Sequence, residues 1–386
     1  MDNSERINTQ NQELPETEDL AFLPLEEEPL EPHLQELEQS PISTPAPPQI
    51  NVRAVSSRAH LSLFLFSEVA SLVVMILSIL AMLFQSVLPE GIFEDPKSSA
   101  ILSIVMSSIS QYAIAFPLTI LCFRLCFKNI PKITPDAQTR KFKPMDLLGL
   151  FAVLQLVATV GSLMGTILGD VLSEILGIGI SDPLNDIVSS LPVWLIVLAV
   201  VIIGPIVEEI LFRKLLFDRL AVLGELFAIL LTSFAFGAFH GNIYQFFYAT
   251  MAGLVFGYVY SRTRKLIYSI VLHSAFNFFG SVVSLEMYKL SEKLTEALPN
   301  DPSSTLTYVF YNLILTLYSA IQFALMAGGF AILIYAFVKK KIQVSTKNPL
   351  GIENKHKILN PALCNAGVII FYVSCLITTI LNLFLA

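Results

Sequence analysis

The stretch VIIGPIVEEILFRK, residues 201–214, begins as a membrane-spanning run and then places Glu208, Glu209 and Arg213 inside it. A charged side chain at the centre of a lipid-facing helix costs roughly 2.5–3.5 kcal/mol on insertion scales. Three such residues would offset much of the gain from the surrounding isoleucine, valine and leucine side chains. We therefore expect these groups to face the interior of a helix bundle, where they can pair or line a hydrated cavity.

The composition of the chain is that of a polytopic membrane protein. Of its 386 residues, 54% are hydrophobic and 14% are charged, against about 25% charged residues in soluble domains. Several apolar runs exceed 18 residues, the length typical of a transmembrane helix. We predict an all-α bundle of eight or nine transmembrane helices, with the polar site between helices of the 190–282 segment. The apolar runs lie at about 61–88, 100–123, 146–168, 190–211, 223–240, 243–261, 266–284, 308–337 and 366–386.

The acidity of the chain is concentrated at its N-terminus. Residues 1–60 hold 12 Asp and Glu against 3 Arg, whereas the remaining residues hold 19 acidic and 21 basic side chains. The tail is rich in Glu and Pro and poor in aromatic residues, and such a segment cannot bury enough apolar surface to fold alone. We therefore divide the chain into a disordered acidic tail, N-terminal transmembrane helices, a core and C-terminal transmembrane helices, at 1–57, 58–189, 190–282 and 283–386.

Basic loops, such as those at 123–144 and 338–357, alternate with acidic or mixed loops along the chain. Under the positive-inside rule, this alternation places the basic loops and the N-terminus in the cytosol. The first apolar run begins only near His60, so no cleavable signal peptide is expected. The pattern suits an integral protein of a bacterial plasma membrane, and an organelle membrane remains an alternative.

The spacing of the charged residues places their side chains on different faces of the helix. Glu209 and Arg213 are four residues apart with the acid first, so they lie on one helix face and can pair. Glu208 lies about 100° round the helix from Glu209, and the pairing would leave it as a free carboxylate aimed elsewhere. Gly204 and Pro205 precede the glutamates by one turn. Because Pro205 removes a helix hydrogen bond, a kink is expected there.

Two further apolar runs carry polar residues that do not belong in lipid. His240 closes SFAFGAFH, and His273 with Asn277 lies in SIVLHSAFNFFG. Together with Glu208, these residues could supply one carboxylate, two imidazoles and one amide to a shared hydrated cavity. A carboxylate can take a proton from water, an imidazole can share it or bind a metal, and donors can hold an oxyanion. This equipment suits peptide hydrolysis without a nucleophilic side chain.

The expected depth of His240 in the membrane differs from that of Glu208 and His273. At 1.5 Å per residue, Glu208 and His273 lie within roughly 10 Å of the cytosolic edge, whereas His240 falls nearer the outer end of its run. A short, tilted or re-entrant helix at 223–240 would bring His240 to the other groups.

The three polar clusters resemble the signatures of the CPBP family, intramembrane proteases that include CAAX prenyl endopeptidases and bacteriocin-processing or bacteriocin-immunity proteins. The resemblance covers about residues 190–282, and it identifies that segment as a CPBP-like catalytic core. EExxxR, FxxxH and HxxxN are matched by Glu208-Glu209-Ile-Leu-Phe-Arg213, Phe236-Gly-Ala-Phe-His240 and His273-Ser-Ala-Phe-Asn277.

The resemblance implies a catalytic role for the motif residues. Glu208 would be the carboxylate that activates water, assisted by His240. His273 and Asn277 would stabilise the oxyanion, and the Glu209–Arg213 pair would brace the site. The implied enzyme is a CAAX-like intramembrane protease that acts within the bilayer on a peptide or membrane-protein substrate.

Whether this hydrolase needs a cofactor stays open at the level of sequence. The family is described both as metalloproteases, with a divalent metal such as Zn²⁺, and as metal-free glutamate proteases. HExxH is absent, which excludes a zincin site on spacing. Lys214 and Arg264 stand where the family commonly has a glycine and a small residue, and both substitutions fall near the expected cytosolic edge.

Two other functions remain alternatives. One is a non-catalytic membrane scaffold, or a bacteriocin self-immunity or regulatory protein, with the same fold. The other is a secondary transporter whose carboxylates and histidines relay protons. That class should show internal repeat symmetry, which we do not find in the sequence. No nucleic-acid partner is expected, and the sequence does not indicate which substrate is cleaved.

Overall fold

The computed structural model describes residues 50–89, 91–130, 132, 140–179, 191–296 and 305–385. Within these ranges every regular element is a helix, and seven helical spans are long and apolar enough to cross a membrane. The predicted all-α polytopic membrane fold is therefore confirmed. The expected acidic tail lies outside the described residues as far as position 49, and the first helix begins at Val52, inside the range assigned to that tail.

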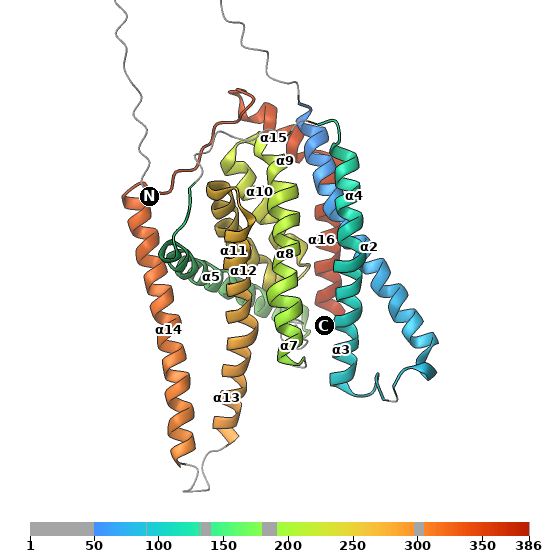
Figure 1. Cartoon of the computed structure of the whole chain (residues 1–386), viewed down its shortest axis with the longest axis vertical. Helices are drawn as coiled ribbons and strands as arrows, with labels where there is room; N and C mark the ends of the chain where they lie inside the picture. Colours follow the sequence, from blue (N-terminus) through green and yellow to red (C-terminus); the bar gives the residue numbers. More distant parts are fainter. Residues whose placement is uncertain are drawn as a thin grey trace, which may run out of the picture. The chain divides into compact units, whose positions relative to one another are not determined.

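The helices follow one another along the chain as shown in Figure 1. They are α2 (Val52–Leu83), α3 (Pro96–Ser108), α4 (Phe116–Phe127), α5 (Pro144–Leu176), α7 (Val193–Ile196), α8 (Gly204–Glu209), α9 (Asp218–Leu220), α10 (Glu225–Phe239), α11 (Ile243–Thr263), α12 (Leu266–Asn277), α13 (Ser284–Glu296), α14 (Thr305–Val338), α15 (Lys355–Leu363) and α16 (Ala366–Leu385). Two short 3₁₀ turns also occur, η1 (Gln85–Val87) and η5 (Ala221–Leu223).

Four π-helical stretches continue some of these helices into longer spans. They are η2 (Ile109–Ala115) between α3 and α4, η3 (Val197–Ile203) and η4 (Ile210–Phe217) on either side of α8, and η6 (Phe278–Val283) between α12 and α13. Stretches of π-helix are rare and often lie at functional sites. Here η3, η4 and η6 interrupt the two spans that carry Glu208 and His273, and η2 interrupts the span formed by α3 and α4.

Within the described residues each of the nine apolar runs is mainly helical, and the helices differ in length. The 308–337 run is one helix of 34 residues, α14, so it forms a single element. The 223–240 run forms α10, which has 15 residues and is about 22 Å long. It is too short to cross a hydrocarbon layer of about 30 Å. The short helix that His240 requires is therefore present.

The turn between α10 and α11 lies against α16. Gly241 has a φ of 58°, a conformation that favours glycine, and Asn242 caps α11 by accepting a hydrogen bond from Tyr244 N at 2.9 Å. The side-chain amide of Asn382 donates to Gly241 O at 2.8 Å. Asn382 lies roughly 24 Å along the axis of α16 from the first residue of that helix. The turn beside His240 is therefore held at a depth inside the membrane span that α16 forms.

Glycines allow α5 to lie close to α11. A Cβ atom at Gly161 would stand 2.6 Å from Tyr248 Cα, and one at Gly165 would stand 2.7 Å from Tyr244 O. Small residues let membrane helices approach in this way, because packing rather than a hydrophobic effect drives their association in lipid. This close packing holds α5 beside α11, where α5 forms one wall of the cavity that Glu208 also lines.

Large apolar side chains are exposed along the outer helices, where a bilayer would cover them. They include Leu83, Ile175, Phe323, Phe337 and Leu376. The buried side chains instead gather around α8, η4, α10 and α11, and include Phe212, Phe217, Phe236, Phe256 and Tyr260.

The basic loops meet at one end of the bundle. Lys132 pairs with Asp218, Arg140 N donates to Arg262 O at 2.7 Å, and Ser345 N donates to a Glu225 carboxylate oxygen at 3.0 Å. In Figure 1 the end of α4, α9 and α15 lie at this end, whereas α3 and α7 begin at the other. The alternation of loop charge therefore corresponds to the two ends of the fold.

Lys214 and Arg264, the two departures from the family pattern, share one partner. Lys214 Nζ lies 3.3 Å from a carboxylate oxygen of Asp218, and Arg264 Nη1 lies 3.6 Å from the other. Asp218 is buried, and Tyr260 donates its hydroxyl to it at 3.0 Å. The two substitutions thus form one electrostatic cluster beside the helix that carries Glu208 and Glu209.

Candidate active site

The glutamates lie at the end of a short α-helical segment between two π-helical ones. α8 contains Pro205 near its start and ends with Glu208 and Glu209. η3 precedes it and η4 follows it. The sequence predicts a kink at the proline; the structure shows wider turns on both sides of it. Because a π turn shifts the side chains that follow, it changes which face Glu208 and Glu209 occupy relative to α12.

Glu209 and Arg213 form the pair expected from their spacing. Both side chains are fully buried, and Arg213 Nε donates to Glu209 Oε2 at 3.2 Å. Arg213 Nη1 also donates to Thr232 Oγ1 at 3.2 Å, and its guanidinium lies 5.6 Å from the centre of the Phe236 ring. A buried charge pair costs desolvation energy that further hydrogen bonds must offset. Thr232 supplies one of these.

His273 lies between the two glutamates. Its Nδ1 is 3.1 Å from Glu209 Oε1, and its Nε2 is 3.5 Å from Glu208 Oε2. Phe256 stacks on the imidazole with ring centres 4.6 Å apart. Arg213 pairs with Glu209 and leaves Glu208 outside that pair, and the packing of α12 on α8 brings His273 to Glu208. The shorter contact, to Glu209 Oε1, is a hydrogen bond, and Glu208 Oε2 lies within ion-pair distance of the other ring nitrogen.

One cavity of about 850 Å³ collects the predicted residues. Glu208, His240, His273 and Asn277 all line it, and the Glu208 side chain is 26% exposed. His240 Nδ1 donates to Phe236 O at 2.7 Å, which leaves Nε2 of a neutral ring as an acceptor. The structure thus brings together groups from α8, α10 and α12.

Asn277 is held by the helix that carries the glutamates. Its Nδ2 donates to Val200 O, in η3, at 2.9 Å. An amide nitrogen carries two protons, so one N–H remains for a group inside the cavity. Glu209 and Arg213 do not line the cavity and lie behind it.

The donor set does not fit a catalytic zinc site. Such sites use three protein ligands, and no cluster of three His, Cys, Asp or Glu side chains able to hold a metal ion occurs in the described part of the chain. Both nitrogens of His273 face glutamates. Among the described residues that line the cavity, that leaves Glu208 and His240 as potential metal ligands.

The sequence analysis missed several residues of the site. Tyr112 of η2 and Gln155 of α5 line the cavity, and both come from helices outside the motif segment. Thr232 and Phe256, which contact Arg213 and His273, lie inside that segment. A polar residue in an apolar run was the available signal for Gln155 and Thr232. Nothing in the sequence distinguishes Tyr112 or Phe256 from other aromatic residues.

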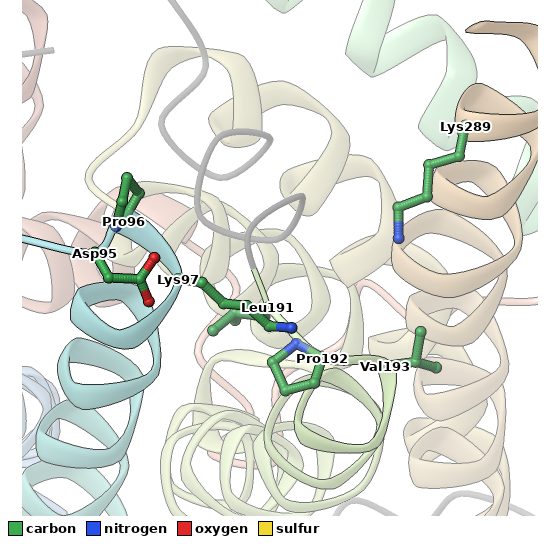
Figure 2. Close-up of a pocket in the computed structure, with 7 residues that line it drawn as sticks. All are labelled: Asp95, Pro96, Lys97, Leu191, Pro192, Val193 and Lys289. Carbon is green, nitrogen blue, oxygen red and sulfur yellow. The ribbon is translucent and has the colours of Figure 1, made fainter. Parts of the chain in front are cut away.

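A second, smaller hollow of about 540 Å³ lies between the starts of α3 and α7 and the side of α13. Figure 2 shows Lys97 and Lys289 reaching into it from different helices, with Asp95 on the same side as Lys97. Asp95 caps α3, and the hydrogen bonds from the Ser98 hydroxyl and amide hold the pKa of its carboxyl below its usual range. No histidine or second carboxylate is among the described residues that line this hollow, so we place the proposed chemistry in the larger cavity.

Comparison with known proteins supports the same segment. Residues 190–279 match the family model described as "Type II CAAX prenyl endopeptidase Rce1-like". The chain is also 34% identical over 102 residues to "Putative membrane peptidase YdiL" of Bacillus subtilis (strain 168). That match covers 26% of this chain and 41% of the relative, and no solved structure matches significantly. The match and the motifs agree on the same segment: through residues 190–279 this chain is similar to the CAAX prenyl endopeptidases of that family model.

Proposed function

We propose that this protein is an intramembrane endopeptidase that hydrolyses peptide bonds of membrane-associated proteins or peptides. The observation that carries the proposal is the convergence of Glu208, His240, His273 and Asn277 on one cavity. They come from three helices and include a carboxylate, an acceptor nitrogen and an amide donor, which is the set that water-dependent amide hydrolysis requires. The relative named as a membrane peptidase supports the same class of activity.

Glu208 acts as the general base in this proposal. A water molecule between Glu208 and His240 Nε2 gives its proton to the carboxylate, and its oxygen attacks the carbonyl carbon of the scissile bond. The second N–H of Asn277 donates to the oxyanion. The tetrahedral intermediate then collapses, the C–N bond breaks, and the proton passes from Glu208 to the leaving amine. One water is consumed, and one acid and one amine are formed.

His273 has a positioning role in this scheme. The family resemblance links it to the oxyanion, but its ring nitrogens face Glu208 and Glu209. A group held from both sides can fix the direction of the Glu208 carboxylate. The buried Glu209–Arg213 pair in turn fixes His273. Rigid support of this kind places the base close to the water that it deprotonates.

We place the basic end of the bundle in the cytosol of a bacterial plasma membrane. The support is the concentration of basic loops at that end and the bacterial origin of the similar protein. In this orientation Glu208 lies in the cytosolic half of the bilayer, and the N-terminus is cytosolic.

The proposal is tested by peptide cleavage in proteoliposomes. Purified wild-type protein is incubated with a peptide library, and products are identified by mass spectrometry alongside the Glu208→Ala and His240→Ala variants. The exposed carboxylate of Glu174, on α5, provides a matched control as Glu174→Gln. We expect cleavage by the wild type and the control, and a loss of about 100-fold or more in both site variants. Equal cleavage by all four proteins would overturn the proposal and favour a non-catalytic role.

A further inference from the structure

One buried polar group in the cavity wall has no partner. Gln155, on α5, is 8% exposed and lines the cavity. Its Nε2 donates to no atom among the residues that the structure describes. Leaving such a donor unpaired costs about 1–3 kcal/mol, and α5 is otherwise strongly apolar around this position. An amide in this position suits a ligand that accepts hydrogen bonds.

Gln155 begins a polar face of α5. Thr159 and Ser162 follow it at i+4 and i+7, and all three line the cavity. At 1.5 Å per residue, these side chains extend over roughly 10 Å of the wall. Thr159 donates its hydroxyl to Gln155 O at 2.8 Å, so its proton is used within the helix. The amide of Gln155 is not used in this way.

The continuous α12–η6–α13 span forms a second polar wall of the same cavity. Asn277, Ser281, Ser284 and Tyr288 line the cavity, and at 1.5 Å per residue they extend over roughly 16 Å from the reactive end. The Ser284 hydroxyl lies 2.9 Å from Phe279 O, to which it can donate, and 2.9 Å from the Tyr318 hydroxyl, where either group can be the donor. The cavity is therefore elongated and polar along two walls.

We propose that the cavity holds its substrate as an extended peptide and that Gln155 Nε2 donates to one main-chain carbonyl oxygen of that peptide. The inference rests on the proposed endopeptidase function. An extended segment has unpaired C=O and N–H groups that cannot be left unsatisfied inside a membrane. A wall of roughly 16 Å matches about five extended residues at ~3.3 Å each. A purely apolar chain would leave the Gln155 amide unpaired.

The first test compares kinetics on a fluorogenic peptide taken from the library. Gln155→Met keeps the length of the side chain and removes its donor, and Gln155→Leu serves as a second variant. We expect each to lower kcat/KM by about 10- to 100-fold, the loss of one hydrogen bond to substrate. Thr119 is a matched control, because its hydroxyl is also buried and unpaired but lies outside the cavity lining. Thr119→Val should keep the wild-type value.

The second test locates the carbonyl that Gln155 binds. Each peptide bond of the probe, except the scissile one, is replaced in turn by an ester, whose carbonyl is a weaker acceptor. We expect one ester to lower the wild-type kcat/KM markedly and to have no further effect in Gln155→Met. If Gln155 only stabilised the fold, that ester would lower kcat/KM by the same factor in the wild type and in Gln155→Met.

The outcomes separate this inference from the proposed function. Wild-type kcat/KM in Gln155→Met, or ester effects that are equal in wild type and variant at every position, would overturn the role of Gln155. If these results occur while Glu208→Ala is inactive, the endopeptidase proposal stands and the inference alone fails. Full cleavage by Glu208→Ala would instead overturn the proposed function.

Discussion

His273 lies between Glu208 and Glu209, with Nε2 3.5 Å from the first carboxylate and Nδ1 3.1 Å from the second. Adjacent residues of one helix are thereby joined through a side chain that is 64 positions away along the chain. The arrangement links the buried Glu209–Arg213 pair to the half-buried Glu208 at the cavity wall. We infer that the direction of the Glu208 carboxylate, the proposed general base, depends on His273.

We predict that His273→Gln lowers kcat by about 100-fold and changes KM less than about threefold, because a positioning group acts on the transition state more than on binding. The measurement is steady-state cleavage of a library-derived peptide in proteoliposomes. An increase in KM with an unchanged kcat would show that His273 binds substrate instead.

Breaking the buried pair should destabilise the protein. We expect Arg213→Met to reduce the free energy of unfolding by about 3–5 kcal/mol, because Glu209 is left as an uncompensated buried charge. The double variant Glu209→Met/Arg213→Met should lose less, because both charges are gone. Glu286→Gln is the control, since its ion pair with Lys289 is exposed and should contribute about 0–1 kcal/mol. Thermal unfolding in detergent measures the change in each of the three variants. A double variant as unstable as Arg213→Met would contradict this account.

The close packing of α5 on α11 can be tested by substituting a glycine of α5. Gly161→Ala places a methyl group against the Tyr248 backbone, and we expect a loss of about 1–3 kcal/mol from overpacking. Gly328→Ala in α14 meets no atom within 4 Å. It should be neutral or stabilising, because alanine favours the helix by up to about 1 kcal/mol. Equal melting temperatures for the two variants would show that the close contact is absent.

Chelation should leave cleavage unchanged. The nitrogens of His273 face glutamates, so among the described lining residues Glu208 and His240 are left as potential metal ligands, fewer than the three ligands of a catalytic zinc site. The measurement is cleavage after dialysis against EDTA and after treatment with 1,10-phenanthroline, with metal content determined in parallel. Loss of activity that Zn²⁺ restores would mean that His273 turns away from a glutamate to bind the ion.

The sequence was sufficient for features that depend on local spacing. An i, i+4 relation predicted the Glu209–Arg213 pair, and run length and loop charge predicted an all-helical membrane fold with its basic loops at one end. The three motifs also predicted that Glu208, His240 and Asn277 would share a cavity.

Features set by packing between distant helices could not be predicted. The contacts of His273 depend on how α12 lies against α8, and the π-helical turns on either side of α8 have no sequence signature. Gln155 lies outside the motif segment, on a helix that joins the cavity only because its glycines meet α11. A single polar residue in an apolar run does not indicate which neighbouring helix it faces.

The most direct test of the central claim is a cryo-electron microscopy structure of the inactive Glu208→Gln variant with an uncleaved peptide bound. We predict that the scissile carbonyl carbon lies near the side chains of residue 208 and His240, about 3–4 Å from a bound water, with its oxygen at the Asn277 amide. A peptide bound elsewhere, for example in the hollow of Figure 2, with this cavity empty, would contradict the account.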